Sequence, residues 1–508
     1  MISLRVDRTT AFAVLSGLLL ALAFPRPDLA ELAWVALVPL LLVMEKRPFR
    51  SGFTAGVAFF ATVLYWLNIV MTTYGGLHPV LSMVAYLLLV LYLALFFGAA
   101  TWAASRLHEK LGYPLVLTMP VLWVALEFLR SFLFTGFPWA SLGYALQSRL
   151  VLIQSADLFG VYGLSFLLIL SNVVLAEGIR WLRRSRGVPG VAALVFALLF
   201  GGNIVYGLWR LDPAQDERER RMQVSLIQGN IDQGVKWDPA YQEETVRIYR
   251  DLSLHAHQGE NPDLIIWPEA ATPFYFQDPN PLSQQVRQVA QETNTYLLFG
   301  SPAYEVVNRQ YQYLNSAFLL SPAGEVLGRS DKVHLVPFGE YVPLKRFLPF
   351  VDKLVVGIGD FSPGTVSPLP LDGANLGILV CYEAIFPGLA RDFVRQGSDL
   401  LINITNDAWF GRSSAPYQHL AMSRFRAVEN RIWLARAANT GISAYVTPTG
   451  RVLEATPLFE SAAVTAQVGL GAAESLYRRI GDTVPTIFLG ISVFWLARTG
   501  RRMGAGEA

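Results

Sequence analysis

Cys381 is the only cysteine in this chain of 508 residues, and its surroundings suit a reactive thiol. It follows the apolar run LGILV at residues 376 to 380, which predicts a buried strand that ends at the thiol. Pro387 then marks the start of a helix, whose positive end would favour the thiolate. We therefore expect Cys381 to be a nucleophile. The alternative is a small buried side chain without a chemical role.

Glu269 and Lys332 have the residue types that an attacking thiol needs beside it. Glu269 ends the apolar stretch DLIIWPE, so we expect it at the same sheet edge as Cys381, where it could act as a general base. Lys332, in GRSDKVHLVPFGEYVP, could stabilise an oxyanion and lower the pKa of the thiol. Solvated surface positions are the alternative for both. His334 and His419 are alternative bases.

A folded α/β domain should position these side chains. After the charged stretch RLDPAQDERERR, short strand-like runs alternate with amphipathic helical stretches and turn residues. The expected strands are QVSLIQGNI, DLIIWPE, YLLFGSPAY, LNSAFLLSP, LGILVCYE, DLLINITND, ARAANTGISAYVTP and AAVTAQVGL. The expected helices cover residues 239 to 257, 281 to 294, 385 to 396 and 416 to 431. About 250 residues can bury a full core and still carry a site.

The rest of the chain is apolar enough to lie in a membrane. Hydrophobic residues make up 53% of the chain and charged residues 16%, with a mean hydropathy of +0.37. The net charge of +2 and the scattered basic residues argue against a nucleic-acid partner. Because a helix needs about 20 apolar residues to cross a bilayer, we expect eight spans. They lie near residues 10–24, 31–45, 52–73, 79–105, 114–133, 158–182, 189–209 and 483–498. The first run could instead be a signal peptide.

Lysine and arginine residues indicate the orientation of these spans. Five basic clusters flank alternate ends of the spans, and positive flanks stay on the cytoplasmic side. The clusters begin at Arg5, Lys46, Arg106, Arg180 and Arg498. We therefore expect both termini in the cytoplasm and the α/β domain on the outer side. The expected domains are a membrane domain of seven helices (1–209), a charged linker (210–222), the catalytic domain (223–470), a second linker (471–482) and an eighth span with a cytoplasmic tail (483–508).

Three ordered motifs resemble a known family. Glu269 in WPE, Lys332 in DKVHLVPFGEYVP and Cys381 in CYE resemble the Glu-Lys-Cys triad of the nitrilase superfamily. Together with eight expected spans, they make the chain similar to the membrane-embedded branch, the apolipoprotein N-acyltransferases. Four further pieces are similar: IQGNIDQGVKW at 227–237, TNDAWFG at 405–411, GFPW at 136–139 and YGLSFL at 162–167.

The resemblance implies an αββα sandwich domain and a two-step acyl transfer. Glu269 would deprotonate Cys381, which would take an acyl chain from a phospholipid and form a thioester, with Lys332 holding the oxyanion. The N-terminal α-amine of a diacylglyceryl-cysteine apolipoprotein would then accept the acyl chain. No metal and no cofactor are expected. The resemblance also places the chain in the bacterial inner membrane, with the catalytic domain on the periplasmic side.

Further site residues are implied by the same resemblance. Glu340 and Glu383 are expected to support the triad, and a backbone N–H near Tyr382 to assist Lys332; ordinary loop carboxylates are the alternative. Four aromatic residues are expected to contact substrate at the lipid boundary, with the domain core as the alternative: Trp237, Tyr341, Trp409 and Phe410. Gly357 and Gly359 could let a loop over the site move.

Two other functions fit parts of the sequence. A membrane-anchored hydrolase of the nitrilase superfamily would use the same triad on a nitrile or an amide, but one anchor would suffice for it. A transporter with an outer ligand-binding domain should show paired intramembrane charges along a pathway. Glu127 and Arg130, late in the fifth expected span, are among the few such charges, and we expect them to serve packing before lipid binding.

Overall fold

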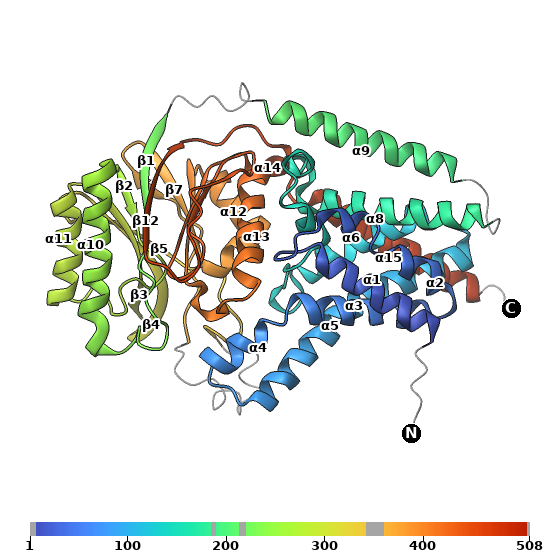
Figure 1. The fold of residues 1–508 in the computed structure, drawn as a ribbon, viewed down its shortest axis with the longest axis horizontal. Coiled ribbons are helices and arrows are strands. Elements are labelled where there is room, and N and C mark those ends of the chain that lie inside the picture. The colour runs from blue at the N-terminus through green and yellow to red at the C-terminus, as the bar shows by residue number, and fades with distance from the viewer. Residues whose placement is uncertain (1–6, 184–188, 213–219, 342–359, 505–508) are drawn as a thin grey trace. The chain divides into compact units, whose positions relative to one another are not determined.

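The computed structural model describes residues 7–183, 189–212, 220–341 and 360–504, and it divides into two compact units (Figure 1). The helical unit contains Met1–Leu67, Val80–Asp212 and Arg479–Ala508. The α/β unit contains Asn68–Pro79 and Pro213–Arg478. Gly357 and Gly359, and most of the expected linker 210–222, lie outside the described residues.

The helical unit contains most of the expected spans as helices. Its longer helices are α1 (Arg8–Leu22), α3 (Pro48–Val63), α5 (Pro79–Leu111), α6 (Leu115–Arg130), α8 (Ala156–Leu182), α9 (Gly190–Arg210) and α15 (Thr483–Gly504). Four described helices are long and apolar enough to cross a membrane, namely α5, α8, α9 and α15; a fifth is α3 if the bent continuation Leu67–Tyr74 is counted with it. The chain is therefore a multi-helix membrane protein, and the count of eight spans stays a prediction.

The expected span at residues 31–45 is wrong as a continuous helix. The structure has a short 3-10 turn, η1 (Ala30–Trp34), followed by the six-residue helix α2 (Val38–Val43), whose first turn contains a proline. Proline is tolerated in the first turn of a helix but not in its interior. Asn172 provides hydrogen bonds to the backbone groups at the break in the helix. Its side chain accepts from the Leu37 N–H (2.7 Å) and donates to the Ala33 carbonyl (2.8 Å).

Glu127 and Arg130 both bind the loop that follows α6. The Glu127 carboxylate accepts from the Leu142 N–H (2.7 Å), and the Arg130 guanidinium donates to the Trp139 carbonyl (2.8 Å). Both side chains are buried. The GFPW loop is thus fastened to its own helix, which agrees with the packing interpretation of these two charges.

The α/β unit contains two six-stranded sheets. The first has the order β12-β1-β2-β3-β4-β5 and the second β11-β10-β9-β8-β7-β6. Within each sheet three neighbouring strands run parallel: β1, β2 and β3 in the first, and β7, β8 and β9 in the second. The first sheet comprises β1 (Arg221–Gln228), β2 (Leu264–Ile266), β3 (Tyr296–Val307), β4 (Gln310–Leu320), β5 (Val326–Asp331) and β12 (Ala462–Gly469). The second comprises β6 (Leu369–Leu371), β7 (Ala374–Val380), β8 (Leu400–Thr405), β9 (Leu434–Ala438), β10 (Ala444–Val446) and β11 (Val452–Leu453).

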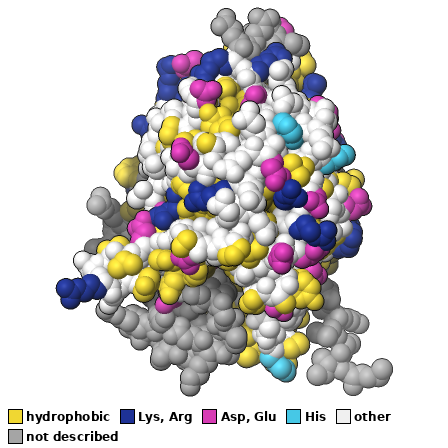
Figure 2. All heavy atoms as spheres, turned by 90° about the vertical axis from the view of Figure 1, so that its left-hand side faces the viewer, with side chains coloured by type: hydrophobic (Ala, Val, Ile, Leu, Met, Phe, Trp, Pro, Cys, Tyr) yellow, Lys and Arg dark blue, Asp and Glu magenta, His cyan; other side chains and the backbone are white. Residues whose placement is uncertain are grey.

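Helices cover the outer face of each sheet, which gives the expected αββα sandwich (Figure 1). Helices α10 (Gln242–Glu260) and α11 (Pro281–Thr293) pack on the first sheet, and α12 (Pro387–Arg395) and α13 (Ala415–Asn430) on the second. A third apolar core joins the inner faces of the two sheets and includes Val224, Ile266, Ile378 and Ile402. Figure 2 shows charged side chains of both signs interspersed over the side that carries α10 and α11, as on a solvated surface.

Two segments differ from the expected domain limits. Asn68–Pro79, expected in the membrane domain, groups with the α/β unit, because the Tyr74 ring packs edge-on against Trp409 with centroids 6.1 Å apart. Residues 471–482, expected as a linker, contain the short helix α14 (Leu476–Ile480). The Tyr477 ring of α14 is fully buried, so this segment is packed against the α/β unit. The other limits stay predictions.

Candidate active site

Cys381 lies directly after β7, where the chain turns away from the sheet. A 3-10 turn, η9 (Cys381–Ile385), follows, and α12 begins at Pro387 as the sequence predicts. The backbone of Cys381 has a φ of +54°, in the left-handed region that residues with a Cβ rarely adopt. This conformation presents a partly buried thiol at the carboxyl end of the strand.

The pKa of Cys381 is set by opposing effects. Burial raises the pKa of the Cys381 thiol to about 12, and the Glu269 carboxylate raises it further, while the Lys332 ammonium lowers it. Lys332 thus acts on the pKa of the thiol in the expected direction, but burial of the thiol and the Glu269 carboxylate outweigh it. The thiol therefore keeps its proton until a base removes it.

Glu269 and Lys332 meet in this site from the other sheet. Glu269 follows β2 by three residues, and Lys332 follows β5 directly. The Lys332 Nζ lies 3.7 Å from the Glu269 Oε1 and 2.8 Å from the Glu340 Oε1. The carboxylates of Glu269 and Glu340 thus lie close to the Lys332 ammonium. The charge of Glu269 also raises the pKa of the Cys381 thiol. The structure thus brings the three sequence-predicted residues together.

Lys332 is held as an ammonium. Its side chain is only 1% exposed, and burial alone would lower its pKa. The carboxylates of Glu340 and Glu269 outweigh that effect and raise the pKa of Lys332 well above its usual value. A fixed positive charge in a buried site can stabilise a developing oxyanion, and it is a poor proton donor.

Asn315 is a site residue that the sequence analysis missed. Its side-chain Nδ2 donates to the Glu269 Oε1 (2.9 Å) and to the Glu340 Oε1 (2.8 Å). The Asn406 backbone N–H donates to the second oxygen of Glu269 (3.0 Å). The base is therefore oriented by two donors. Asn315 lies within LNSAFLL on β4, and an asparagine between apolar residues and Ser316 gave no distinct signal in the sequence.

Glu383 links the Lys332 segment to the Cys381 turn. Its Oε1 accepts from the Val333 N–H (2.6 Å) and the His334 N–H (2.8 Å), and its Oε2 accepts from the Val380 N–H (2.6 Å). Burial raises the pKa of Glu383 to about 7, although these three N–H groups oppose the shift. Because its oxygens bind backbone groups on both sides, its position fits a supporting role better than that of an ordinary loop carboxylate.

Lys236 is a second buried cation that the sequence analysis missed. Its side chain is fully buried, and its Nζ donates to the backbone carbonyl of Glu269 (3.1 Å). Burial lowers the pKa of Lys236 to about 8, while the charges of Glu269 and Cys381 oppose the shift. In the motif GVKW the sequence predicts a role for Trp237 and none for Lys236.

The expected substrate-contacting residues are aromatic side chains that remain at least partly accessible. Trp237 is 50% exposed, and Tyr341, Trp409 and Phe410 have intermediate exposure. The Tyr382 ring packs edge-on against Phe386 with centroids 5.2 Å apart. Their exposure argues against the alternative of a closed domain core. Their contact with substrate stays a prediction.

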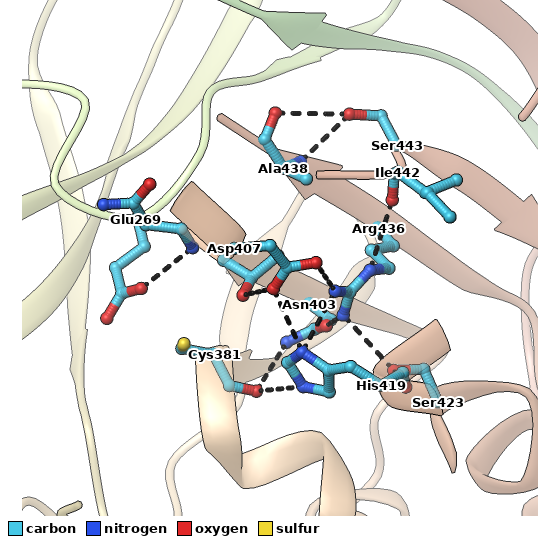
Figure 3. A network of polar contacts seen from close by, with 12 residues as sticks. Glu269, Cys381, Asn403, Asp407, His419, Ser423, Arg436, Ala438, Ile442 and Ser443 are labelled. Carbon is cyan, nitrogen blue, oxygen red and sulfur yellow. Dashed lines mark hydrogen bonds and ion pairs between the residues drawn. The ribbon is translucent and has the colours of Figure 1, made fainter. Parts of the chain in front are cut away.

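The two alternative bases are engaged elsewhere. The His334 ring packs on Phe386 with centroids 3.9 Å apart, and burial and the Lys332 charge lower its pKa. The His419 Nε2 lies 3.1 Å from the backbone carbonyl oxygen of Cys381, which faces away from the thiol (Figure 3). Over residues 7–183, 189–212, 220–341 and 360–504, no group of three or more His, Cys, Asp or Glu residues could hold a metal ion.

Comparisons with known proteins show the family to which this chain belongs. Residues 16–174 match the model of the apolipoprotein N-acyltransferase N-terminal domain, and residues 223–478 match that of carbon-nitrogen hydrolase. An apolipoprotein N-acyltransferase of Geobacter metallireducens is 52% identical over 482 residues, which cover 94% of this chain and 92% of the relative. Another, of Nitrosomonas europaea, is 36% identical and covers 90% of each chain. A solved amidase from Nesterenkonia sp. is 23% identical over 51% of this chain and 92% of its own, with a TM-score of 0.37. The chain therefore belongs to the apolipoprotein N-acyltransferase family.

Proposed function

We propose that this enzyme transfers an acyl chain from a phospholipid to the N-terminal α-amine of a diacylated apolipoprotein, with Cys381 as the acyl carrier. The observation that carries the proposal is the convergence of Glu269, Lys332 and Cys381 in one buried site of a chain in this family. A thiol, a base and a fixed cation are the groups that covalent acyl transfer requires.

In the first half-reaction, the Cys381 sulfur attacks the ester carbonyl carbon of the phospholipid while Glu269 takes the thiol proton. The thiol needs this base, because its pKa lies near 12. The Lys332 ammonium and the Tyr382 backbone N–H stabilise the tetrahedral oxyanion. The ester C–O bond then breaks, and Glu269 returns the proton to the departing lysophospholipid oxygen. A Cys381 thioester remains.

In the second half-reaction, the α-amine of the apolipoprotein attacks the thioester carbonyl carbon. Glu269 takes a proton from the attacking amine, and Lys332 again stabilises the oxyanion. The C–S bond breaks, and the proton passes from Glu269 to the departing sulfur, which restores the thiol. One ester aminolysis is thus divided into two easier steps.

Asn315 and Glu340 support Glu269 and Lys332 in this scheme. Glu340 forms an ion pair with Lys332 and so orients it, and Asn315 bridges the two carboxylates by donating one hydrogen bond to each. Trp237, Tyr341, Trp409 and Phe410 would contact the lipid substrates. Withdrawing an acyl chain from lipid costs about 0.8 kcal/mol per methylene, so the site should open toward the bilayer.

We also assign the enzyme to the bacterial inner membrane, with the catalytic unit on the periplasmic side and both termini in the cytoplasm. The basic residues between the apolar runs support this orientation. A membrane-anchored hydrolase is less well supported, because it would not explain the match of residues 16–174 to an acyltransferase-specific model.

Intact mass spectrometry tests the first half-reaction. Purified enzyme incubated with phospholipid should gain the mass of one acyl chain, and Cys381→Ala should gain nothing. Adding a diacylated lipopeptide should remove the added mass within the turnover time, whereas water should remove it slowly. A mass gain in Cys381→Ala would contradict the acyl-enzyme, and rapid release by water would indicate the hydrolase.

A further inference from the structure

Two side chains form hydrogen bonds with the backbone carbonyl oxygen of Cys381, on the side away from its thiol. The His419 Nε2 lies 3.1 Å from the Cys381 carbonyl oxygen, and the Asn403 Nδ2 lies 3.3 Å from the same oxygen (Figure 3). Both side chains are fully buried. They therefore fix the plane of the peptide that follows Cys381, at the residue whose φ of +54° is strained.

Asp407 and Arg436 fix the orientation of His419. The Arg436 Nη2 donates to the Asp407 Oδ2 (2.7 Å) and lies 3.1 Å from the His419 Nδ1. The Thr405 hydroxyl donates to the Asp407 Oδ1 (3.0 Å). All of these side chains are buried, and the backbone around them is crowded, since a Cβ added at Gly441 would lie 2.5 Å from the Asp407 Oδ2.

The contact with the Cys381 carbonyl oxygen places a proton on the Nε2 of His419. The Nε2 faces a carbonyl oxygen, which only accepts, so it must be an N–H donor. The Nδ1 lies 3.1 Å from both the Arg436 Nη2, which only donates, and the Asp407 Oδ1, which only accepts. In the neutral ring with its proton on Nε2, the Nδ1 accepts from Arg436. Burial and the neighbouring Arg436 charge lower the pKa of His419, in agreement with a neutral ring.

Asn403 belongs to the same network. Its Oδ1 accepts from the Arg436 Nη1, and its Nδ2 also donates to the Leu379 carbonyl (2.8 Å). Asn403 lies on β8, beside β7 in the sheet, so this side chain ties the end of β7 to its neighbour. Arg436, on β9, thus orients both side chains that hold the Cys381 carbonyl.

We propose that His419 and Asn403, oriented by Arg436 and Asp407, are positioning residues that hold Cys381 in its left-handed conformation and so aim the thiol at the carbonyl carbon of the acyl donor. The inference rests on the proposed function and deepens it. None of the four residues takes part in proton transfer. If the hold on the carbonyl were lost, Cys381 could relax toward a negative φ, and its Cβ would swing away from Glu269 and Lys332.

Two polar substitutions of His419 test this role. Glutamine can place its Nε2 near the position of the histidine Nε2, whereas asparagine reaches only the Asp407 and Arg436 side of the pocket. His419→Asn should slow acyl-enzyme formation from labelled phospholipid, in a single turnover, by about 100-fold, the usual effect of misplacing a reacting group. His419→Gln should remain within about threefold of the wild type, because it restores one hydrogen bond to the carbonyl.

A second readout separates positioning from a folding defect. Alkylation of the lone cysteine by iodoacetamide needs no oxyanion stabilisation, and moving the thiol away from both Glu269 and Lys332 removes opposing effects on its pKa. The alkylation rate should therefore change by less than about threefold in both variants. Ser443→Ala is the matched control, since the Ser443 hydroxyl is buried and donates to the Gln228 Oε1 (2.7 Å) away from Cys381. This variant should acylate at the wild-type rate.

Distinct outcomes would overturn the two proposals. A wild-type rate in His419→Asn, or an equal loss in His419→Gln, would contradict the positioning role. A loss of acylation together with a large gain in alkylation would also contradict it, since it would indicate general unfolding that exposes the thiol. Failure of the wild type itself to form an acyl-enzyme would instead contradict the proposed function.

Discussion

Replacing Lys332 by methionine should destabilise the α/β unit as well as abolish its chemistry. The Lys332 Nζ lies 2.8 Å from the Glu340 Oε1 and 3.7 Å from the Glu269 Oε1, and the side chains of these two carboxylates are only 12% and 10% exposed. Lys332→Met keeps most of the volume and removes the charge. Two carboxylates would then remain buried beside one another without their cation.

The expected magnitude follows from this burial. Removing one partner of a buried ion pair costs about 3–5 kcal/mol. In a unit of this size, each kcal/mol shifts the unfolding midpoint by about 2–4 °C, so the midpoint should fall by about 6–20 °C. Acyl-enzyme formation should fall by about 100-fold or more, because an oxyanion donor is lost.

A second substitution separates stability from chemistry. Lys332→Met combined with Glu340→Gln removes one of the unpaired charges. The double variant should therefore recover about half, or more, of the decrease in the unfolding midpoint temperature. It should not recover acyl-enzyme formation. The assay is thermal unfolding in detergent beside single-turnover acylation of the same samples. A double variant that melts as low as Lys332→Met, or one that acylates at the wild-type rate, would refute the reasoning.

Three further predictions concern protonation. The alkylation rate of Cys381 by iodoacetamide should still rise with pH at pH 10, because burial raises the pKa of the thiol to about 12. Glu269→Gln should lower that apparent pKa. A plateau of the alkylation rate near pH 8.5 in the wild type would contradict this prediction. Burial raises the pKa of Glu383 from 4.5 to about 7, so the folded state binds its proton more tightly and unfolding free energy should fall as pH rises between these values. Glu383→Gln should flatten that slope, and an unchanged slope would locate the effect elsewhere. Lys236→Met removes a buried ammonium whose pKa is lowered to about 8, and it should slow acylation by about tenfold with its largest effect below pH 8; equal loss at all pH values would contradict a role for the charge.

Much of the α/β unit could be predicted from hydrophobic periodicity and turn residues. The expected helix at residues 281 to 294 is α11 (Pro281–Thr293), and that at 416 to 431 is α13 (Ala415–Asn430). The strand ending at Cys381 and the helix starting at Pro387 also lie where the sequence places them. These elements are predictable because each one buries one face against its own sheet.

The parts that could not be predicted depend on contacts between distant segments. Asn315 and Lys236 do not stand out from their neighbours in the sequence, and their partner Glu269 lies 46 and 33 residues away. The charge state of Cys381 depends on how deeply the thiol is buried, which the sequence does not contain. The broken span at residues 31–45 is likewise stabilised by Asn172, a side chain of another helix.

Transfer of a labelled acyl chain from isolated acyl-enzyme is the decisive test of Cys381 as the acyl carrier. Enzyme acylated from a phospholipid with an isotopically labelled acyl chain is separated from the donor and mixed with a diacylated lipopeptide that has a free N-terminal amine. We expect the label to leave Cys381 and to appear on the lipopeptide α-amine, one chain per molecule. With the N-acetylated lipopeptide, which has no free amine, the enzyme should stay acylated. Label that reaches the lipopeptide without first being bound to Cys381 would contradict the proposed mechanism. Release of the label as free fatty acid, at the same rate in the absence of lipopeptide, would also contradict it.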